Sequence, residues 1–233
     1  MLSNCIIKLS FSQLQASVSR FELLSNHIKN IAQQIACAKC DSPVSQSRYQ
    51  PRGWYHWAWS PVVGCKHGCE YCYARKEFDD FDTPRINLKA LEEPKKYKKP
   101  SVIFVCPFAD LFGEWVDRLW IQTVIDVVRY NPIHQFAFLT KNPKRYHEFQ
   151  FPENVYLGAT IESPEKMFRA DAMKGLTNKL LASIEPVMGN FSGVDLSMFD
   201  WVVAGYMIGR KKTKADRENM RSIAHRNKYQ IYR

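Results

Sequence analysis

Short apolar runs alternate with amphipathic segments through most of the chain beyond residue 53. The runs with strand character lie at residues 54–59, 102–106, 135–140, 154–159, 180–184 and 201–205, with 229–232 as a weaker candidate. The clearest amphipathic helices are expected at residues 115–130 and 214–226. Short buried runs separated by helices are typical of βαβ units, so the pattern predicts an α/β fold with a parallel sheet.

Polar residues recur where the predicted strands end, and their positions help to distinguish a barrel from an open sheet. These residues are Asp110, Thr140, Lys141, Thr160, Glu162, Ser183, Glu185 and Gly205. The carboxyl ends of the strands are the face on which βα barrels build their chemistry. The pattern therefore favours a partial (βα) barrel of about six parallel strands, with a doubly wound open sheet as the alternative.

The first 50 or so residues have a different character. Apolar residues between 11 and 36 follow the alternating three-and-four spacing of a helix with one apolar seam, at Phe11, Leu14, Val18, Phe21, Ile28 and Ile35. A polar segment rich in serine follows, and its Cys37 and Cys40 are only half of a zinc site, which indicates incidental thiols. We therefore expect a helical extension and linker over residues 1–48 and the barrel domain over residues 49–233.

Composition places the chain among ordinary globular proteins. Of its 233 residues, 45% are hydrophobic and 24% are charged. No apolar stretch approaches the roughly 20 residues of a spanning helix, and the N-terminus lacks the pattern of a secretory signal. We expect a cytoplasmic protein without a membrane partner, whose seven cysteines are thiols or metal ligands.

The formal net charge of +10 favours a polyanionic partner, although many basic enzymes bind only small anions. The basic residues gather in segments 95–99, 141–145, 210–214 and 217–233. A nucleotide or nucleic acid is therefore one candidate for the substrate.

Three cysteines within eight residues carry the strongest chemical signal. Cys65, Cys69 and Cys72 follow the first predicted strand in a C-x3-C-x2-C pattern. A structural zinc site needs four ligands, of which His67 or a distant residue would be the fourth. Three thiolates also suit a [4Fe–4S] cluster that leaves one iron open to a cofactor or substrate.

The same motif resembles that of the radical S-adenosylmethionine superfamily, in which an aromatic residue precedes the third cysteine as Tyr71 does here. The resemblance covers residues 54–233. Its flanks, residues 57–64, 73–76, 110–113, 138–143 and 183–186, resemble an uncharacterised, phage-associated branch of that superfamily.

The resemblance implies a definite chemistry. Cys65, Cys69 and Cys72 would hold the cluster, and its open iron would bind S-adenosylmethionine. An electron from a donor such as flavodoxin or ferredoxin would cleave the cofactor to methionine and a 5′-deoxyadenosyl radical, which takes a hydrogen atom from the substrate.

Roles for other residues follow from the same resemblance. Tyr71 would lie near the adenine of the cofactor, and Lys141 would meet its carboxylate or an anionic substrate. The candidates for the methionine amino group, the ribose hydroxyls or the substrate are Asp110, Thr140, Glu162 and Glu185. No catalytic residue acting on the substrate is identified.

The chain also departs from the superfamily pattern. Many members carry Gly-Gly-Glu after the second strand, where this chain has residues 106–110, Cys-Pro-Phe-Ala-Asp. The later turn at residues 205–209, Gly-Tyr-Met-Ile-Gly, lacks the expected acid. Cys106 is open to three roles: core packing, support of the site, or catalysis. The alternative to an enzyme is a basic zinc- or iron–sulfur-binding protein that binds nucleic acid without catalysis.

Overall fold

The computed structural model describes residues 53–76, 78–209, 211–224 and 229–231. The predicted helix at 11–36, the linker, and Cys5, Cys37 and Cys40 lie outside the described residues. No helix among the described residues is long and apolar enough to cross a membrane.

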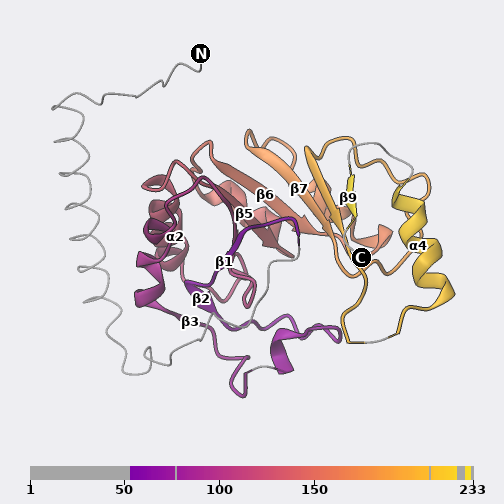
Figure 1. Cartoon of the computed structure of the whole chain (residues 1–233), viewed down its shortest axis with the longest axis horizontal. Coiled ribbons are helices and arrows are strands. Elements are labelled where there is room, and N and C mark those ends of the chain that lie inside the picture. The colour runs from indigo at the N-terminus through magenta and orange to yellow at the C-terminus, as the bar shows by residue number, and fades with distance from the viewer. Residues whose placement is uncertain (1–52, 77, 210, 225–228, 232–233) are drawn as a thin grey trace, which may run out of the picture. The chain divides into compact units, whose positions relative to one another are not determined.

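The main sheet contains all seven predicted strands, and every pair of neighbours is parallel. In spatial order these are β1 (Trp57–Trp59), β4 (Val102–Val105), β5 (Gln135–Thr140), β6 (Val155–Thr160), β7 (Lys179–Ile184), β8 (Trp201–Ala204) and β9 (Tyr229–Ile231). Within the described residues β1 and β9 are the two edges, so the sheet forms an open, incomplete barrel (Figure 1). The predicted α/β class is therefore confirmed.

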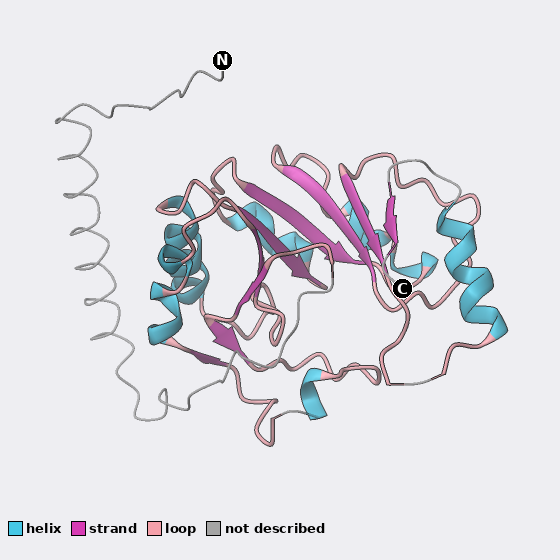
Figure 2. Ribbon diagram, in the orientation of Figure 1, coloured by secondary structure: helices cyan, strands magenta, loops and turns pink. Residues whose placement is uncertain are grey.

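Both of the predicted long helices are present. α2 (Arg118–Arg129) follows β4, and Asp117 caps it by accepting a hydrogen bond from the backbone amide of Leu119. α4 (Lys214–Ala224) follows β8 (Figure 2).

The remaining connections hold less helix than a regular βα alternation predicts. They contain α3 (Phe168–Asp171) and the 3₁₀ turns η2 (Ala74–Lys76), η3 (Leu88–Glu92), η4 (Pro94–Lys96), η5 (Pro143–Glu148) and η6 (Pro164–Lys166). No helix is described between β7 and β8. Proline begins η4, η5 and η6, where its fixed φ favours a helical start, but none of them extends beyond six residues.

Side chains on β5 alternate between the two faces of the sheet, as expected of a strand buried on both sides. Phe136 and Phe138 are fully buried on one face. Ala137 lies on the other face and packs in a cluster with Trp54 and Tyr55, and Leu139 lies on that same face one step closer to the carboxyl end. Leu139 lines a cavity. The inner face of the sheet is therefore closed by aromatic packing at one end and open at the carboxyl ends of its strands.

A second, antiparallel sheet flanks the loop that carries the cysteines. It consists of β2 (Val62–Val63) and β3 (Arg85–Ile86), with Val62 opposite Ile86. Two-residue strands are too short to leave a periodic signal in the sequence, which is why this pair was not expected.

Candidate functional site

The cysteine loop is fixed where it leaves β2. The backbone amide of Gly64 donates to the carbonyl of Phe108, and that of Cys65 donates to the carbonyl of Phe81. Gly64 has φ +96°, and a Cβ there would lie 2.7 Å from the carbonyl oxygen of Thr83. Only glycine fits this position, because any side chain would meet backbone atoms.

The three cysteines line one cavity of about 190 Å³ at the carboxyl ends of the strands. Their thiols are half-buried and form no disulfide. Among the described residues, no three His, Cys, Asp or Glu side chains converge closely enough to hold a single metal ion. In an iron–sulfur cubane each thiolate binds a different iron, so a donor set of three thiols around one cavity fits that group.

Burial raises the pKa of the Cys65 thiol to about 11, and the nearby charge of Asp110 acts in the same direction. In the absence of a metal this thiol is therefore protonated at neutral pH. Metal binding would remove that proton, because a coordinating thiol is deprotonated.

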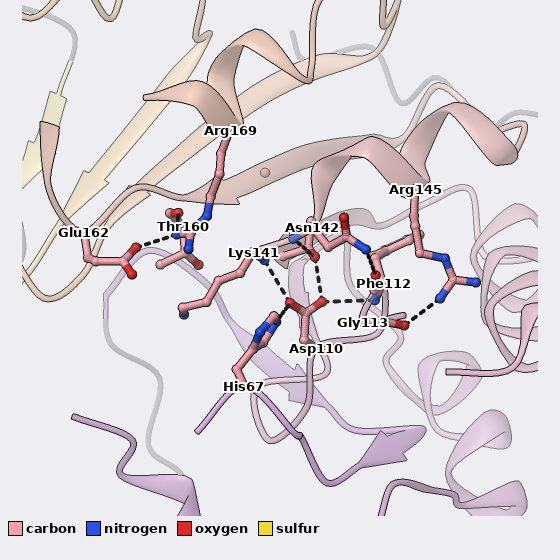
Figure 3. A network of polar contacts seen from close by, with 12 residues as sticks. His67, Asp110, Phe112, Gly113, Lys141, Asn142, Arg145, Thr160, Glu162 and Arg169 are labelled. Atoms are coloured by element: carbon pink, nitrogen blue, oxygen red, sulfur yellow. Dashed lines mark hydrogen bonds and ion pairs between the residues drawn. The ribbon is translucent and has the colours of Figure 1, made fainter. Parts of the chain in front are cut away.

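Asp110 is buried, lines the cavity and lies at the centre of a polar network (Figure 3). Its Oδ2 accepts hydrogen bonds from His67 Nε2 at 2.6 Å and from the backbone amide of Lys141 at 2.8 Å. Its Oδ1 accepts from Thr140 Oγ1 at 2.6 Å and from the backbone amide of Phe112 at 3.0 Å. A carboxylate offers about four acceptor positions, so the acceptor capacity of Asp110 is filled.

The carboxylate of Asp110 is ionised despite its burial. Burial alone would raise its pKa, but the hydrogen bond and charge of His67, together with the bonds from Thr140 and the Lys141 amide, lower it below the ordinary value. Thr140 is engaged twice, since its hydroxyl also accepts from the amide of Asn142 at 2.9 Å.

Glu162 lies behind Tyr71 rather than on the wall of the cavity. Its Oε1 accepts from the Tyr71 hydroxyl at 3.1 Å, and its Oε2 accepts from Arg169 Nη1 at 2.6 Å. Burial would raise the pKa of Glu162, but a bond from its own backbone amide and the charges of Lys141 and Arg169 lower it. The result is a buried ion pair that fixes the Tyr71 hydroxyl.

Tyr71 presents its ring to the cavity beside the cysteines. The ammonium group of Lys141 lies 5.4 Å from the centre of that ring, within reach of a cation–π interaction. The sequence did not indicate a role for Arg169, the buried partner of Glu162, because an arginine in a helical segment is ordinarily solvated.

The far wall of the cavity comes from the ends of β6, β7 and β8. Thr160, Ser183 and Glu185 line it. A Cβ on Gly205 would lie 3.0 Å from Oε1 of Glu185, so the glycine leaves room for the Glu185 carboxylate at the end of β8. Tyr71, Asp110, Thr140, Lys141 and Glu185 therefore meet at the cavity, and Glu162 supports it from behind.

Cys106 is buried at the end of β4 and lines the same cavity. Its φ of +55° makes it the one non-glycine residue with positive φ among the described residues. Burial raises the pKa of its thiol to about 12, so it is a protonated thiol at neutral pH.

A family model described as "Protein of unknown function (DUF5131)" matches residues 51–231. Among solved structures, a doubly substituted spore photoproduct lyase with bound AdoMet and dinucleoside spore photoproduct is similar, with a TM-score of 0.50 and 14% identity, over 73% of this chain and 61% of that chain. A singly substituted form of the same lyase has a TM-score of 0.50 and 14% identity, over 82% of this chain and 65% of that chain.

This chain therefore spans less than two thirds of the length of the lyase, and at this identity the likeness is one of fold. No curated protein matches the chain.

Proposed function

The chain belongs to the family described as Protein of unknown function (DUF5131), and we propose that this member is a radical S-adenosylmethionine enzyme holding a [4Fe–4S] cluster on Cys65, Cys69 and Cys72. The observation that carries the proposal is the position of the three thiols. They line one cavity at the carboxyl ends of parallel strands, where βα folds build their active sites. A solved protein of similar fold holds AdoMet.

A cluster bound there would supply one electron to cleave S-adenosylmethionine to methionine and a 5′-deoxyadenosyl radical. Flavodoxin or ferredoxin is the kind of electron donor that we propose. The contribution of the chain is to hold the cofactor, orient it and exclude water.

Glu185 is the acid that we assign to the methionine amino group. Asp110 has its acceptor positions filled by four donors, and Glu162 lies behind Tyr71 in an ion pair. Of the three predicted acids, Glu185 combines a place on the cavity wall with a carboxylate that Gly205 accommodates. A carboxylate pairs with an ammonium group through charge-assisted hydrogen bonds.

In this proposal Lys141 meets the carboxylate of the cofactor, and Tyr71 lies near its adenine. Lys141 lines the cavity, its ammonium group lies 5.4 Å from the centre of the Tyr71 ring, and this cation suits a carboxylate. The Tyr71 hydroxyl is held by Glu162, which fixes the ring at the cavity beside the position that we propose for the adenine.

Asp110 and Thr140 act as positioning residues rather than as ligands. Their bonds to His67 and to the Lys141 amide join the cysteine loop to the end of β5. Phe81, Phe104 and Phe108 line the cavity and would exclude water from a reactive radical.

The test is anaerobic reconstitution with iron and sulfide, followed by dithionite reduction with S-adenosylmethionine and detection of 5′-deoxyadenosine by mass spectrometry. We expect 5′-deoxyadenosine from the wild-type protein and none from Cys69→Ala. A protein that takes up zinc and leaves S-adenosylmethionine intact would contradict the proposal. It would favour a metal-binding protein that contacts nucleic acid without catalysis.

A further inference from the structure

We propose that the substrate is a polynucleotide. One of its bases would lie against Tyr206 at the cavity, and the phosphates of the same strand would lie along the basic face of α4. This inference deepens the proposed function and rests on it, because the base would be the group that the enzyme modifies. The supporting observations come from the segment after β8, from Gly205 through α4. Almost no residue of this segment has a role in the cofactor binding proposed above.

Residues 206–208 bring apolar side chains from the end of β8 to the cavity. Tyr206, Met207 and Ile208 all line it, and Ile208 is 47% exposed. These side chains therefore lie where the cavity meets solvent. The Lys212 ammonium group lies 4.5 Å from the centre of the Tyr206 ring. An aromatic ring with a cation beside it, at the edge of a cavity, offers stacking to a base and charge to its phosphate.

The helix that follows is basic on its outer face. Lys214, Arg217 and Arg221 are spaced by three and four residues, so they share one face of α4, and all three are exposed. The opposite face carries Met220 and Ile223, which are buried.

The two acidic residues of α4 reduce the positive charge of this face only partly. Asp216 is buried and accepts hydrogen bonds from the amide and hydroxyl of Thr213 at the helix start. Glu218 lies 3.8 Å from Lys214, a distance typical of a weak surface pair. Lys212, Arg217 and Arg221 add further positive charge to the same region.

The length of the basic face distinguishes a polymer from a small anion. From Lys214 to Arg221 the helix advances about 10 Å, at about 1.5 Å per residue. A face of this length is longer than one phosphate group and spans more than one phosphate of a nucleic-acid strand. A mononucleotide in the cavity would leave the Arg221 end of the basic face without a phosphate to bind. A polynucleotide strand that extends out of the cavity would lie along the whole face.

The binding test uses the full-length protein with its cluster reconstituted. The probe is a fluorescein-labelled single-stranded DNA of about 16 nucleotides, followed by fluorescence anisotropy at several salt concentrations. The variant carries Lys212→Gln, Lys214→Gln and Arg221→Gln. Its matched control carries Lys98→Gln, Lys99→Gln and Lys179→Gln, the same loss of charge at exposed positions near the amino ends of β4 and β7.

We expect the α4 variant to bind about 10-fold more weakly, with a slope of log affinity against log salt that is smaller by about 2. The control should bind nearly as the wild type does. Equal losses in both variants would overturn the inference, because they would indicate a general effect of net charge.

Base recognition is tested separately with Tyr206→Ala and two probes, the oligonucleotide and heparin, which has anionic groups but no bases. We expect affinity for the oligonucleotide to fall about 10-fold and affinity for heparin to stay unchanged. A fall for both probes or for neither would overturn the assignment of a base to Tyr206. Binding to phosphatidylserine vesicles without binding to the oligonucleotide would indicate a membrane surface instead.

An assay of 5′-deoxyadenosine formation in the absence of substrate distinguishes failure of the proposed function from failure of the polynucleotide inference. Cofactor cleavage by a protein that does not bind the oligonucleotide would leave the proposed function standing and overturn this inference. Oligonucleotide binding through α4 and Tyr206 by a protein that does not cleave the cofactor would overturn the proposed function and leave a polynucleotide-binding site without the proposed chemistry.

Discussion

The imidazole of His67 donates a 2.6 Å hydrogen bond to the carboxylate of Asp110, and this bond ties the cysteine loop to the segment that follows β4. His67 lies between two of the proposed cluster ligands, and its ring also contacts Trp115 edge-on at 4.8 Å between ring centres. The cysteine loop is therefore held from the inside of the fold before any cofactor binds.

Replacing Asp110 with asparagine should destabilise the fold strongly. The amide group would present N–H donors to side chains and amides that are themselves donors, in a buried site. We expect the free energy of unfolding to fall by about 3 kcal/mol, measured by urea denaturation. The matched control is Asp117→Asn at the exposed helix cap, where asparagine serves equally well. A loss in Asp110→Asn no larger than in this control would contradict the network.

The contribution of Asp110 should depend on pH with a definite sign. Its pKa in the folded protein lies below the ordinary value of 3.8, so the folded state binds a proton less readily than the unfolded state. The stability advantage of the wild type over Asp110→Asn should be full above about pH 5 and decline as the pH falls through the ordinary value. Urea denaturation of both proteins between about pH 7 and pH 3 measures it, and an advantage that grows in acid would contradict the assignment.

Each cysteine of the motif should be required for the cluster. Cys65→Ala, Cys69→Ala and Cys72→Ala should each lose iron, sulfide and visible absorbance after reconstitution, because three thiolates are the proposed protein ligands. Cys5→Ala, Cys37→Ala and Cys40→Ala, outside the motif, should retain all three. Full retention of the cluster in Cys69→Ala is the outcome that would exclude this ligand set.

Glu185→Gln should weaken binding of S-adenosylmethionine by about 10-fold or more, because the acceptor of the bond from the methionine amino group loses its negative charge. Isothermal titration of the reconstituted protein measures the affinity. Glu165→Gln, an exposed acid on η6, is the control and should leave the affinity unchanged. Gly205→Ala should also weaken binding, since its methyl group would displace the Glu185 carboxylate. Wild-type affinity in both Glu185→Gln and Gly205→Ala would assign the amino group to another residue.

The sequence by itself determined the strands of the main sheet and the cysteine motif. Apolar runs of four to six residues are local signals, and the run at residues 135–140 coincides with β5 as the structure has it. The spacing of Cys65, Cys69 and Cys72 is equally local, because the three cysteines lie on one short loop, and all three line the same cavity. Of the predicted acids that follow the strands, Asp110 and Glu185 line the cavity, whereas Glu162 lies behind Tyr71.

Only the tertiary structure decided what those polar residues do. His67 and Asp110 are 43 residues apart in sequence, and Tyr71 and Glu162 are 91 apart. Such pairs leave no periodic trace, so sequence reasoning treated Asp110, Glu162 and Glu185 as equivalent candidates. Folding makes them different, because a buried carboxylate is stable only when donors fill its acceptor positions. Four donors surround Asp110, an arginine pairs with Glu162 behind Tyr71, and Glu185 lies on the cavity wall beside Gly205.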